Sequence, residues 1–184
     1  MYRFLEGLNP GDLAKFGGQD YEKDVLGGLL GVISMSHYEI HKGKHFTAHT
    51  DVIQIPGGGT MNMVLTVPAG TLGHLVFEMS AFEPWYGGLY EGPTINAPGA
   101  ALVEFNNNRD STETAGIEAT LNATLGAPGD LLRPVLGGGT GIGGSSSSSV
   151  GGSRAEFILT TGEYALVLNG TAAELAYIVA EWYE

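Results

Sequence analysis

One pattern constrains the fold of this chain more than any other. It consists of short runs of β-forming residues, each bounded by glycine, proline or asparagine. The 184 residues include 30 Gly and 8 Pro. From residue 32 onward, turn-forming residues recur about every 8–12 positions, a spacing typical of an antiparallel sandwich or barrel. Strands do not alternate with helical segments, so a parallel α/β fold is not expected. We predict an all-β fold: a jelly-roll-like antiparallel β-sandwich of about ten short strands.

The strand predictions rest on β-branched and aromatic residues between turn residues. The expected strands span residues 45–55, 61–67, 72–82, 86–91, 100–105, 116–124, 131–136, 156–161, 164–169 and 175–183. The short link at 161–163 predicts a hairpin. Segment 175–183 mixes helix-forming Ala, Glu and Leu with Tyr, Ile, Val and Trp. We expect a strand there, because β-branched and aromatic side chains crowd a helix at χ1.

Two segments differ in composition from the rest. Residues 1–31 mix Gly, Pro and charged residues with large apolar side chains, and we expect an extended N-terminal arm before one domain of residues 32–184. Residues 137–153 are almost entirely Gly and Ser, so apolar burial cannot offset the entropy cost of ordering them. We expect a flexible loop between two strands, and such an insertion is tolerated because closure entropy grows only logarithmically with length.

The charge of the chain excludes several classes of partner. Eight Lys and Arg against 20 Asp and Glu give a formal net charge of −12. Nucleic-acid binding depends on cations that neutralise phosphates, so no nucleic-acid partner is expected. An anionic membrane surface is disfavoured for the same reason. The longest apolar stretch, 25–35, is interrupted by glycines and is shorter than the ~20 residues that span a bilayer, so no membrane partner is expected.

The five histidines are the first candidates for a metal site. His37, His41, His45 and His49 follow one another at intervals of four, and His74 comes later. On one strand or helix the first four would share a face, as metal ligands can. Residues 42–44, Lys-Gly-Lys, favour a turn in the middle of the series, so we expect the two pairs on two different strands. We predict no metal and no other cofactor.

The residues that carry enzyme chemistry give little support for catalysis. The chain has no cysteine, and it contains no Gly-X-Ser-X-Gly nucleophile elbow. Glu78, Glu83 and Glu91 would serve as a glycosidase acid and base if they lined one face. An acidic sandwich offers such carboxylates by chance. We predict no catalytic residues and no enzymatic activity.

An aromatic group at 85–90 leaves a carbohydrate-binding alternative open. Trp85, Tyr86 and Tyr90 would form a platform for a sugar ring if all three were exposed. Core packing beside Pro84 explains the same residues, and we favour it.

Residues 105–111, Phe-Asn-Asn-Asn-Arg-Asp-Ser, form the most specific pattern in the chain. Asparagine tolerates a left-handed backbone and bonds its own chain, so Asn106, Asn107 and Asn108 predict an ordered turn after a strand. The guanidinium of Arg109 has the geometry to clamp carbonyls or a carboxylate. We expect a loop that holds one shape.

Five segments together resemble a family of small tailed-phage and prophage structural proteins associated with the capsid. In this order they are 37–46, 89–92, 105–111 (FNNNRDS), 156–159 (EFIL) and the terminal 182–184 (WYE). A Gly/Ser-rich insert before the EFIL strand also fits that family. The match covers residues 36–184 and leaves the first 35 outside. The resemblance implies a virion structural protein and carries no catalytic residue over.

The resulting expectation is a capsid cement or decoration protein. It would be made in the host cytoplasm, bind the major capsid protein on the exterior of the phage head, stabilise the head and associate with itself as a homodimer or homotrimer. The alternative is a carbohydrate-binding β-sandwich of a phage fibre or receptor-binding apparatus. The candidate interface residues lie in the arm and in the asparagine turn: Phe4, Leu5, Leu8, Leu13, Phe16, Asn106, Asn107, Asn108 and Arg109.

Overall fold

The computed structural model of the chain describes residues 35–137 and 156–184. All of these residues belong to one unit, Ser34–Glu184. The expected arm, residues 1–31, lies outside the described residues, and so do residues 138–153 of the expected Gly/Ser loop. Gly137 was predicted to open that loop, but it is the last residue of strand β11 (Asp130–Gly137).

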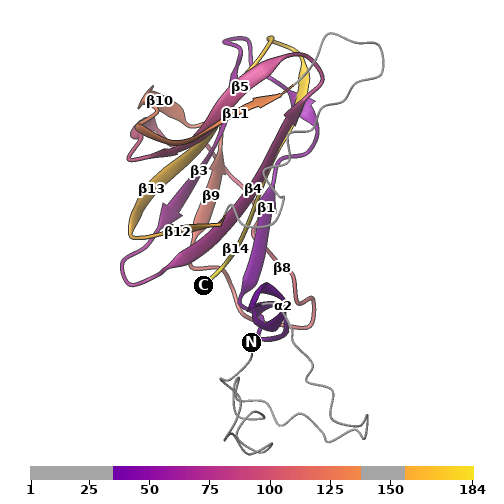
Figure 1. The fold of residues 1–184 in the computed structure, drawn as a ribbon, viewed down its shortest axis with the longest axis vertical. Helices are drawn as coiled ribbons and strands as arrows, with labels where there is room; N and C mark the ends of the chain where they lie inside the picture. Colours follow the sequence, from indigo (N-terminus) through magenta and orange to yellow (C-terminus); the bar gives the residue numbers. More distant parts are fainter. Residues whose placement is uncertain (1–34, 138–155) are drawn as a thin grey trace, which may run out of the picture. The chain divides into compact units, whose positions relative to one another are not determined.

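The described residues form one short helix and fourteen strands (Figure 1). In chain order they are α2 (Met35–His41), β1 (His45–His49), β2 (Ile53–Gln54), β3 (Thr60–Val67), β4 (Gly73–Ala81), β5 (Trp85–Glu91), β6 (Thr94–Ala97), β7 (Ala100–Ala101), β8 (Phe105–Asn106), β9 (Glu118–Leu121), β10 (Thr124–Ala127), β11, β12 (Phe157–Leu159), β13 (Gly162–Asn169) and β14 (Leu175–Tyr183). The helix is too short to cross a membrane, and the described residues contain no membrane-spanning helix.

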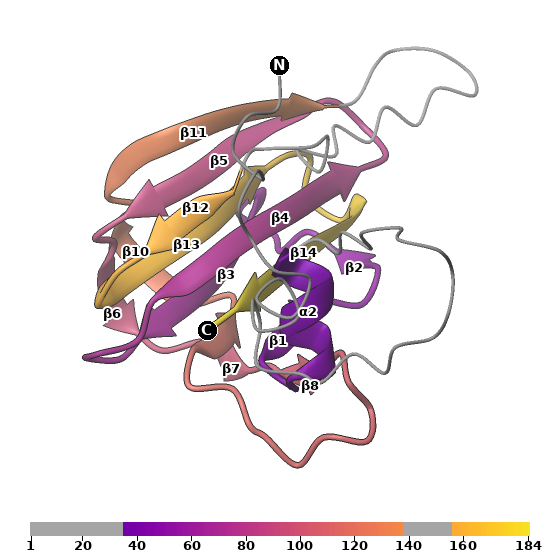
Figure 2. The ribbon, with the colours of Figure 1, turned by 60° about the horizontal axis from the view of Figure 1, so that its bottom comes forward.

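The strands form two antiparallel sheets that stack as a sandwich (Figures 1 and 2). The first sheet has the order β12-β4-β14-β1-β8, with β2 also paired to β14. The second has the order β11-β5-β13-β3-β9-β7. A separate two-stranded ribbon joins β6 and β10. The all-β antiparallel sandwich expected from the sequence is therefore confirmed.

Alternating residues of the central strands build the core between the sheets. On β14, Ala176, Ile178, Ala180 and Trp182 are all at most 1% exposed. They pack in one cluster with residues of β4, β13 and β3: Leu75, Phe77, Met79, Leu166, Leu168, Met61, Met63 and Leu65. Each large side chain buried in this way stabilises the fold by about 1.5–3 kcal/mol. The alternation on β14 confirms the prediction of a strand rather than a helix.

A second, smaller cluster lies under the β6–β10 ribbon. Val64, Ala165 and Val167 are buried together with Ala123. Ile95 and Leu125 of the ribbon pack against this cluster. The ribbon was not predicted, and it explains why Val64, on the face of β3 that points away from the main core, is buried.

Close packing of β5 against β13 requires a glycine at position 87. A Cβ built on Gly87 would lie 1.8 Å from the carbonyl oxygen of Val167 on the neighbouring β13. No side chain fits in that space, so the Gly87–Gly88 pair belongs to the strand rather than to a turn.

The predicted hairpin at 161–163 is wrong. Strand β12 pairs with β4 in the first sheet, whereas β13 pairs with β3 and β5 in the second. The short link therefore crosses between the sheets. The crossing lets Leu159 and Tyr164 both reach the core, each from a different sheet.

The predicted strand 45–55 is interrupted at its middle. Both β1 and β2 pair with β14, but Thr50 turns inward between them and is 4% exposed. Its hydroxyl accepts a hydrogen bond from the Ile178 N–H at 3.0 Å, and its own N–H donates to the Ile178 carbonyl at 2.9 Å. The Thr50 hydroxyl thus accepts the hydrogen bond that a backbone carbonyl would accept in a regular strand pair.

Candidate functional site

The asparagine loop, residues 105–111, begins with the edge strand β8, which pairs with β1. Asn106 fastens the loop to two other segments: its side-chain Nδ2 donates to the carbonyls of Gly43 at 2.8 Å and Glu113 at 3.1 Å. Its Oδ1 accepts from the Asn108 N–H at 2.9 Å. One side chain therefore joins the turn before β1, the loop itself and the segment that follows.

The other two asparagines are bonded just as fully. Asn107 accepts from the Thr47 hydroxyl at 2.8 Å, and its Nδ2 lies 2.7 Å from Nδ1 of His45. Asn108 donates to the His41 carbonyl at 3.3 Å and accepts from the Asp110 N–H at 3.2 Å. Every side-chain amide group of the three asparagines thus has a partner within the chain. The prediction of an ordered turn after a strand is confirmed.

Two ring contacts surround the exposed end of this loop. The Arg109 guanidinium lies over the Phe105 ring, 5.8 Å from its centroid, and His49 stacks on the same ring at 5.4 Å. Arg109 is exposed, and Phe105 is 38% exposed. The predicted contacts of Arg109 with carbonyls or a carboxylate are replaced by this cation–π contact. The loop therefore presents an aromatic ring and a cation to its surroundings.

A row of three rings crosses the outer face of the first sheet. The strand register places His45 of β1 opposite Tyr183 of β14, and Tyr183 opposite His74 of β4. The Tyr183 ring stacks on His45 at 6.3 Å and on His74 at 4.4 Å between centroids. We call these three residues the ring row.

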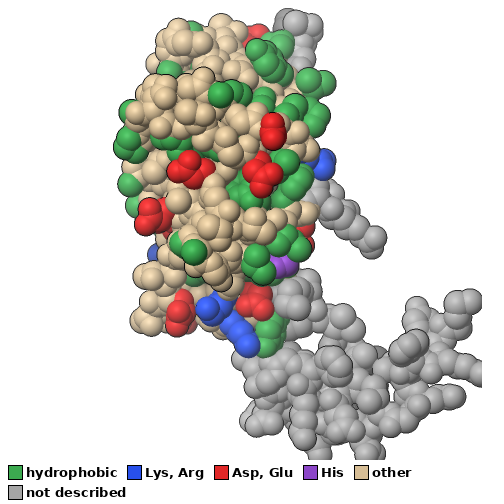
Figure 3. All heavy atoms as spheres, turned by 90° about the vertical axis from the view of Figure 1, so that its left-hand side faces the viewer, with side chains coloured by type: hydrophobic (Ala, Val, Ile, Leu, Met, Phe, Trp, Pro, Cys, Tyr) green, Lys and Arg blue, Asp and Glu red, His purple; other side chains and the backbone are tan. Residues whose placement is uncertain are grey.

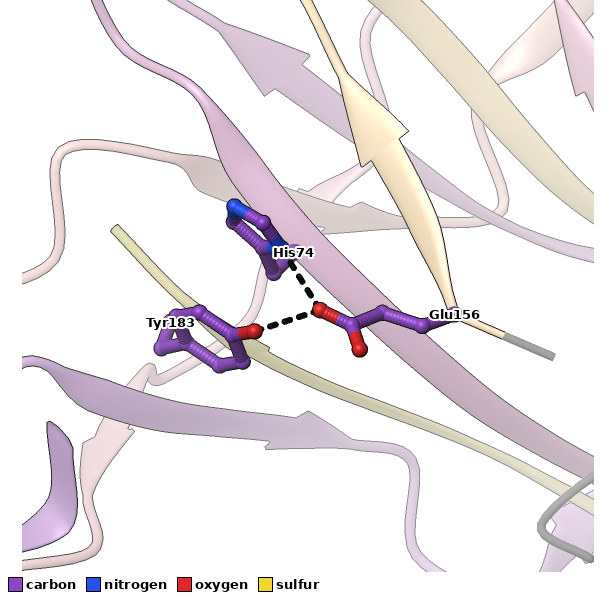
Figure 4. A network of polar contacts seen from close by, with 3 residues as sticks. All are labelled: His74, Glu156 and Tyr183. Carbon is purple, nitrogen blue, oxygen red and sulfur yellow. Dashed lines mark hydrogen bonds and ion pairs between the residues drawn. The ribbon is translucent and has the colours of Figure 1, made fainter. Parts of the chain in front are cut away.

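One carboxylate ties the ring row to the start of β12 (Figure 4). Glu156 Oε1 accepts the Tyr183 hydroxyl at 2.5 Å and lies 2.6 Å from Nδ1 of His74. The hydrogen bond from Tyr183, followed by that from His74, holds the pKa of Glu156 below its usual value. Burial and the neighbouring Glu156 raise the pKa of Tyr183 to about 12. The Tyr183 phenol therefore remains a hydrogen-bond donor at neutral pH.

His45 at the other end of the ring row is nearly fully buried, at 7% exposure. Burial lowers its pKa, and the carboxylate of Glu181 acts weakly in the opposite direction. The imidazole is therefore neutral at pH 7, which leaves Nδ1 able to accept the hydrogen bond from Asn107.

The five histidines fall on three elements. His37 and His41 lie on helix α2 with their Nε2 atoms 3.0 Å apart, whereas His45 and His49 lie on β1 and His74 on β4. The turn at 42–44 is confirmed, but the first pair is helical rather than on a strand. Within residues 35–137 and 156–184, His, Asp and Glu form no group of three that could hold a metal ion.

The carboxylates proposed for a glycosidase are not brought together. Glu78 lies on β4 in the first sheet and accepts the Tyr177 hydroxyl, which raises the pKa of Tyr177. Glu91 ends β5 in the second sheet and accepts the Tyr164 hydroxyl at 3.1 Å. Glu83 follows β4 on the connection to β5. These carboxylates do not share one face.

The aromatic platform suggested by residues 85–90 does not form. Trp85 is 3% exposed and belongs to the core, as core packing predicts, whereas Tyr86 is 63% exposed. Tyr90 packs against the small cluster under the ribbon. Tyr86 is thus the one of the three rings that stands well exposed.

Sequence reasoning missed a group of exposed apolar residues at the junction of β2, β4 and β14. Val52, Phe82 and Leu175 belong to this group. Phe82 stands immediately before Glu83-Pro84, a turn, and a large apolar residue at a turn is the pattern that would have indicated it.

The arm residues Phe4, Leu5, Leu8, Leu13 and Phe16 lie outside the described residues. Comparison of the chain with family models, curated proteins and solved structures gave no match.

Proposed function

We propose that the chain is a virion structural protein, a cement or decoration protein that binds the major capsid protein on the outside of a tailed-phage head. It is made in the host cytoplasm, it stabilises the assembled head, and it associates with further copies of itself. The observation that carries the proposal is the asparagine loop, in which internal hydrogen bonds hold an exposed ring and cation in one position.

A loop held in this way suits an interface for an energetic reason. Binding normally requires loops and side chains to be ordered, and a loop that is already ordered avoids that loss of entropy. Arginine and aromatic residues are also the types that contribute most to protein–protein interfaces. Arg109 and Phe105 are therefore suited to an interface contact.

The charge of the sandwich supports a role on the outside of a particle. The described residues contain four basic side chains, Lys42, Lys44, Arg109 and Arg133, and fifteen Asp or Glu. Carboxylates stand among the apolar side chains on the face in Figure 3. A net negative charge of this size keeps crowded copies of the protein soluble, because the copies repel one another. Their association then depends on specific contacts.

The carbohydrate-binding alternative has less support. A sugar platform needs several exposed rings, and the burial of Trp85 leaves Tyr86 without that neighbour. Binding to a glycan screen, without binding to heads, would favour the alternative over a capsid role.

Stabilisation of heads tests the proposal. Heads of the encoding phage prepared without this protein should release DNA at a lower temperature, and added protein should restore the release temperature. Arg109→Ala should weaken head binding at least about tenfold, whereas Arg133→Ala on β11 is the matched control and should not. Heads whose release temperature does not respond to the protein would refute a cement function.

A further inference from the structure

A hollow lies in the first sheet where β2, β4 and β14 meet. It has a volume of about 280 Å³ and is lined by Val52, Ser80, Ala81, Phe82, Leu175, Ala176 and Tyr177. Phe82 is 67% exposed, Val52 58% and Leu175 41%. The Phe82 N–H donates to the Leu175 carbonyl at 3.2 Å, which holds these two side by side. Because these exposed apolar side chains are grouped rather than scattered, the hollow is a candidate interaction site.

The size of the hollow indicates the kind of occupant. Sites for drug-sized ligands measure roughly 300–1,000 Å³ and enclose most of the ligand. This hollow is smaller and open, so it suits one or two protruding side chains of a protein segment better than a cofactor.

Three acidic residues are sequence neighbours of residues that line the hollow. Asp51 precedes Val52, Glu83 follows Phe82 and Glu174 precedes Leu175. The basic residues of the described part, Lys42, Lys44, Arg109 and Arg133, lie on other elements. The complementary segment therefore carries a large apolar side chain directly beside a cation.

Residues 2–5 of the same chain, Tyr-Arg-Phe-Leu, have this composition. Arg3 stands between Tyr2 and Phe4, so one apolar side chain can enter the hollow while the guanidinium meets a carboxylate at its rim. The thirty residues from Leu5 to Met35 can extend over about 100 Å, which is ample for contact with a neighbouring molecule.

The hollow lies at the opposite end of the sandwich from the point where helix α2 enters it. Helix α2 leads into β1, whose first residue His45 pairs with Tyr183 at the end of β14. The hollow lies at Leu175, the start of β14, so it is at the opposite end of this nine-residue strand. A strand of this length covers about 30 Å. An arm that leaves one end of the sandwich and binds the other end of a second copy makes a head-to-tail contact.

We propose that the hollow binds residues 2–5 of a second copy of this chain, with Phe4 against Phe82, Val52 and Leu175, and Arg3 against Glu83. The proposal rests on the proposed function, because it supplies the contact by which copies associate on the head. It names the surface and the segment that make this contact.

Sedimentation equilibrium of the full chain, without heads, tests the proposal. Phe82→Ser and Phe4→Ser should each raise the dissociation constant of self-association at least about tenfold. The double variant should be no weaker than either single variant, because both remove the same contact. Leu136→Ser is the matched control: Leu136 is 75% exposed on β11, away from the hollow, and its replacement should leave self-association unchanged.

Charge reversal supplies a second readout that does not depend on the apolar contact. Arg3→Glu and Glu83→Arg should each weaken self-association, and the two changes together should restore it. Lys15→Glu, also in the segment before α2, should not weaken it.

Four results would overturn the proposal. A wild-type chain that stays monomeric at all concentrations has no contact between copies, or closes its own arm on its own hollow. An effect of Phe82→Ser without one of Phe4→Ser would mean that another segment fills the hollow. Additive losses in the double variant, or a charge reversal without rescue, would mean that the two regions do not touch. Head binding is measured separately, so a failure here and a failure of the capsid proposal are distinguishable.

Discussion

The Asn107 side chain donates a hydrogen bond to Nδ1 of His45 across 2.7 Å, which joins the asparagine loop to the ring row. The nitrogen that accepts this bond cannot carry a proton. Burial acts in the same direction and lowers the pKa of His45. The contact between the asparagine loop and the ring row therefore requires His45 to be unprotonated at Nδ1.

This relationship predicts a stability that depends on pH. The pKa of His45 is lower in the folded chain than its unfolded value of about 6.5. The unfolded chain thus binds more protons between these two values. Neutral His45 therefore contributes to the free energy of unfolding in full above about pH 6.5. This contribution is lost as the pH falls through the lower pKa that His45 has in the folded chain. His45→Gln should flatten the fall in free energy of unfolding from about pH 7 to about pH 5.

Urea unfolding at a series of pH values measures this effect. His49→Gln on the same strand is the control, because His49 is exposed, and it should keep the wild-type slope. Equal slopes for wild type and His45→Gln would show that His45 does not couple folding to protons.

Asn107 should matter more to stability than an exposed asparagine. Asn107→Ala removes the partner of the Thr47 hydroxyl and of His45 Nδ1, and such losses destabilise by about 1–3 kcal/mol. Asn96→Ala, at an exposed position on β6, should change the free energy of unfolding by less than about 0.5 kcal/mol. Thermal or urea unfolding compares the two, and similar effects would mean that the loop is not held by its amides.

The Glu156 carboxylate should respond to the loss of one hydroxyl. Tyr183→Phe removes the largest cause of its low pKa, so the pKa of Glu156 should rise toward its ordinary value. Carboxyl-carbon NMR titration measures the shift. Tyr86→Phe, at an exposed tyrosine of the second sheet, is the control and should leave the pKa unchanged. An unchanged value in Tyr183→Phe would mean that the bond in Figure 4 does not persist in solution.

The sequence allowed good prediction of strands whose burial alternates. In β14, residues 176, 178, 180 and 182 are buried in turn. The strand itself was predictable from its β-branched and aromatic residues, whereas the alternation of burial appears only in the structure. Segments with special backbone partners were harder. The hydroxyl of Thr50 interrupts a strand pattern that otherwise continues through Ile53, and nothing local distinguishes this threonine from any other.

The candidate site was predictable only in part. The asparagine turn could be recognised because Asn106, Asn107 and Asn108 are neighbours in sequence. The ring row could not be recognised, because His45, His74 and Tyr183 meet only once β1, β14 and β4 are placed side by side in this order. The crossing of the chain from β12 to β13 depends on the same sheet order, which a short link does not reveal.

Binding to isolated heads tests the central claim most directly. Purified full-length protein should co-sediment with heads of the encoding phage that lack it, and binding should saturate at a fixed ratio to the major capsid protein. A variant without residues 1–30 should keep the circular dichroism of a β-sandwich but lose self-association. If the full-length protein stays in the supernatant at every concentration, the chain is not a capsid protein.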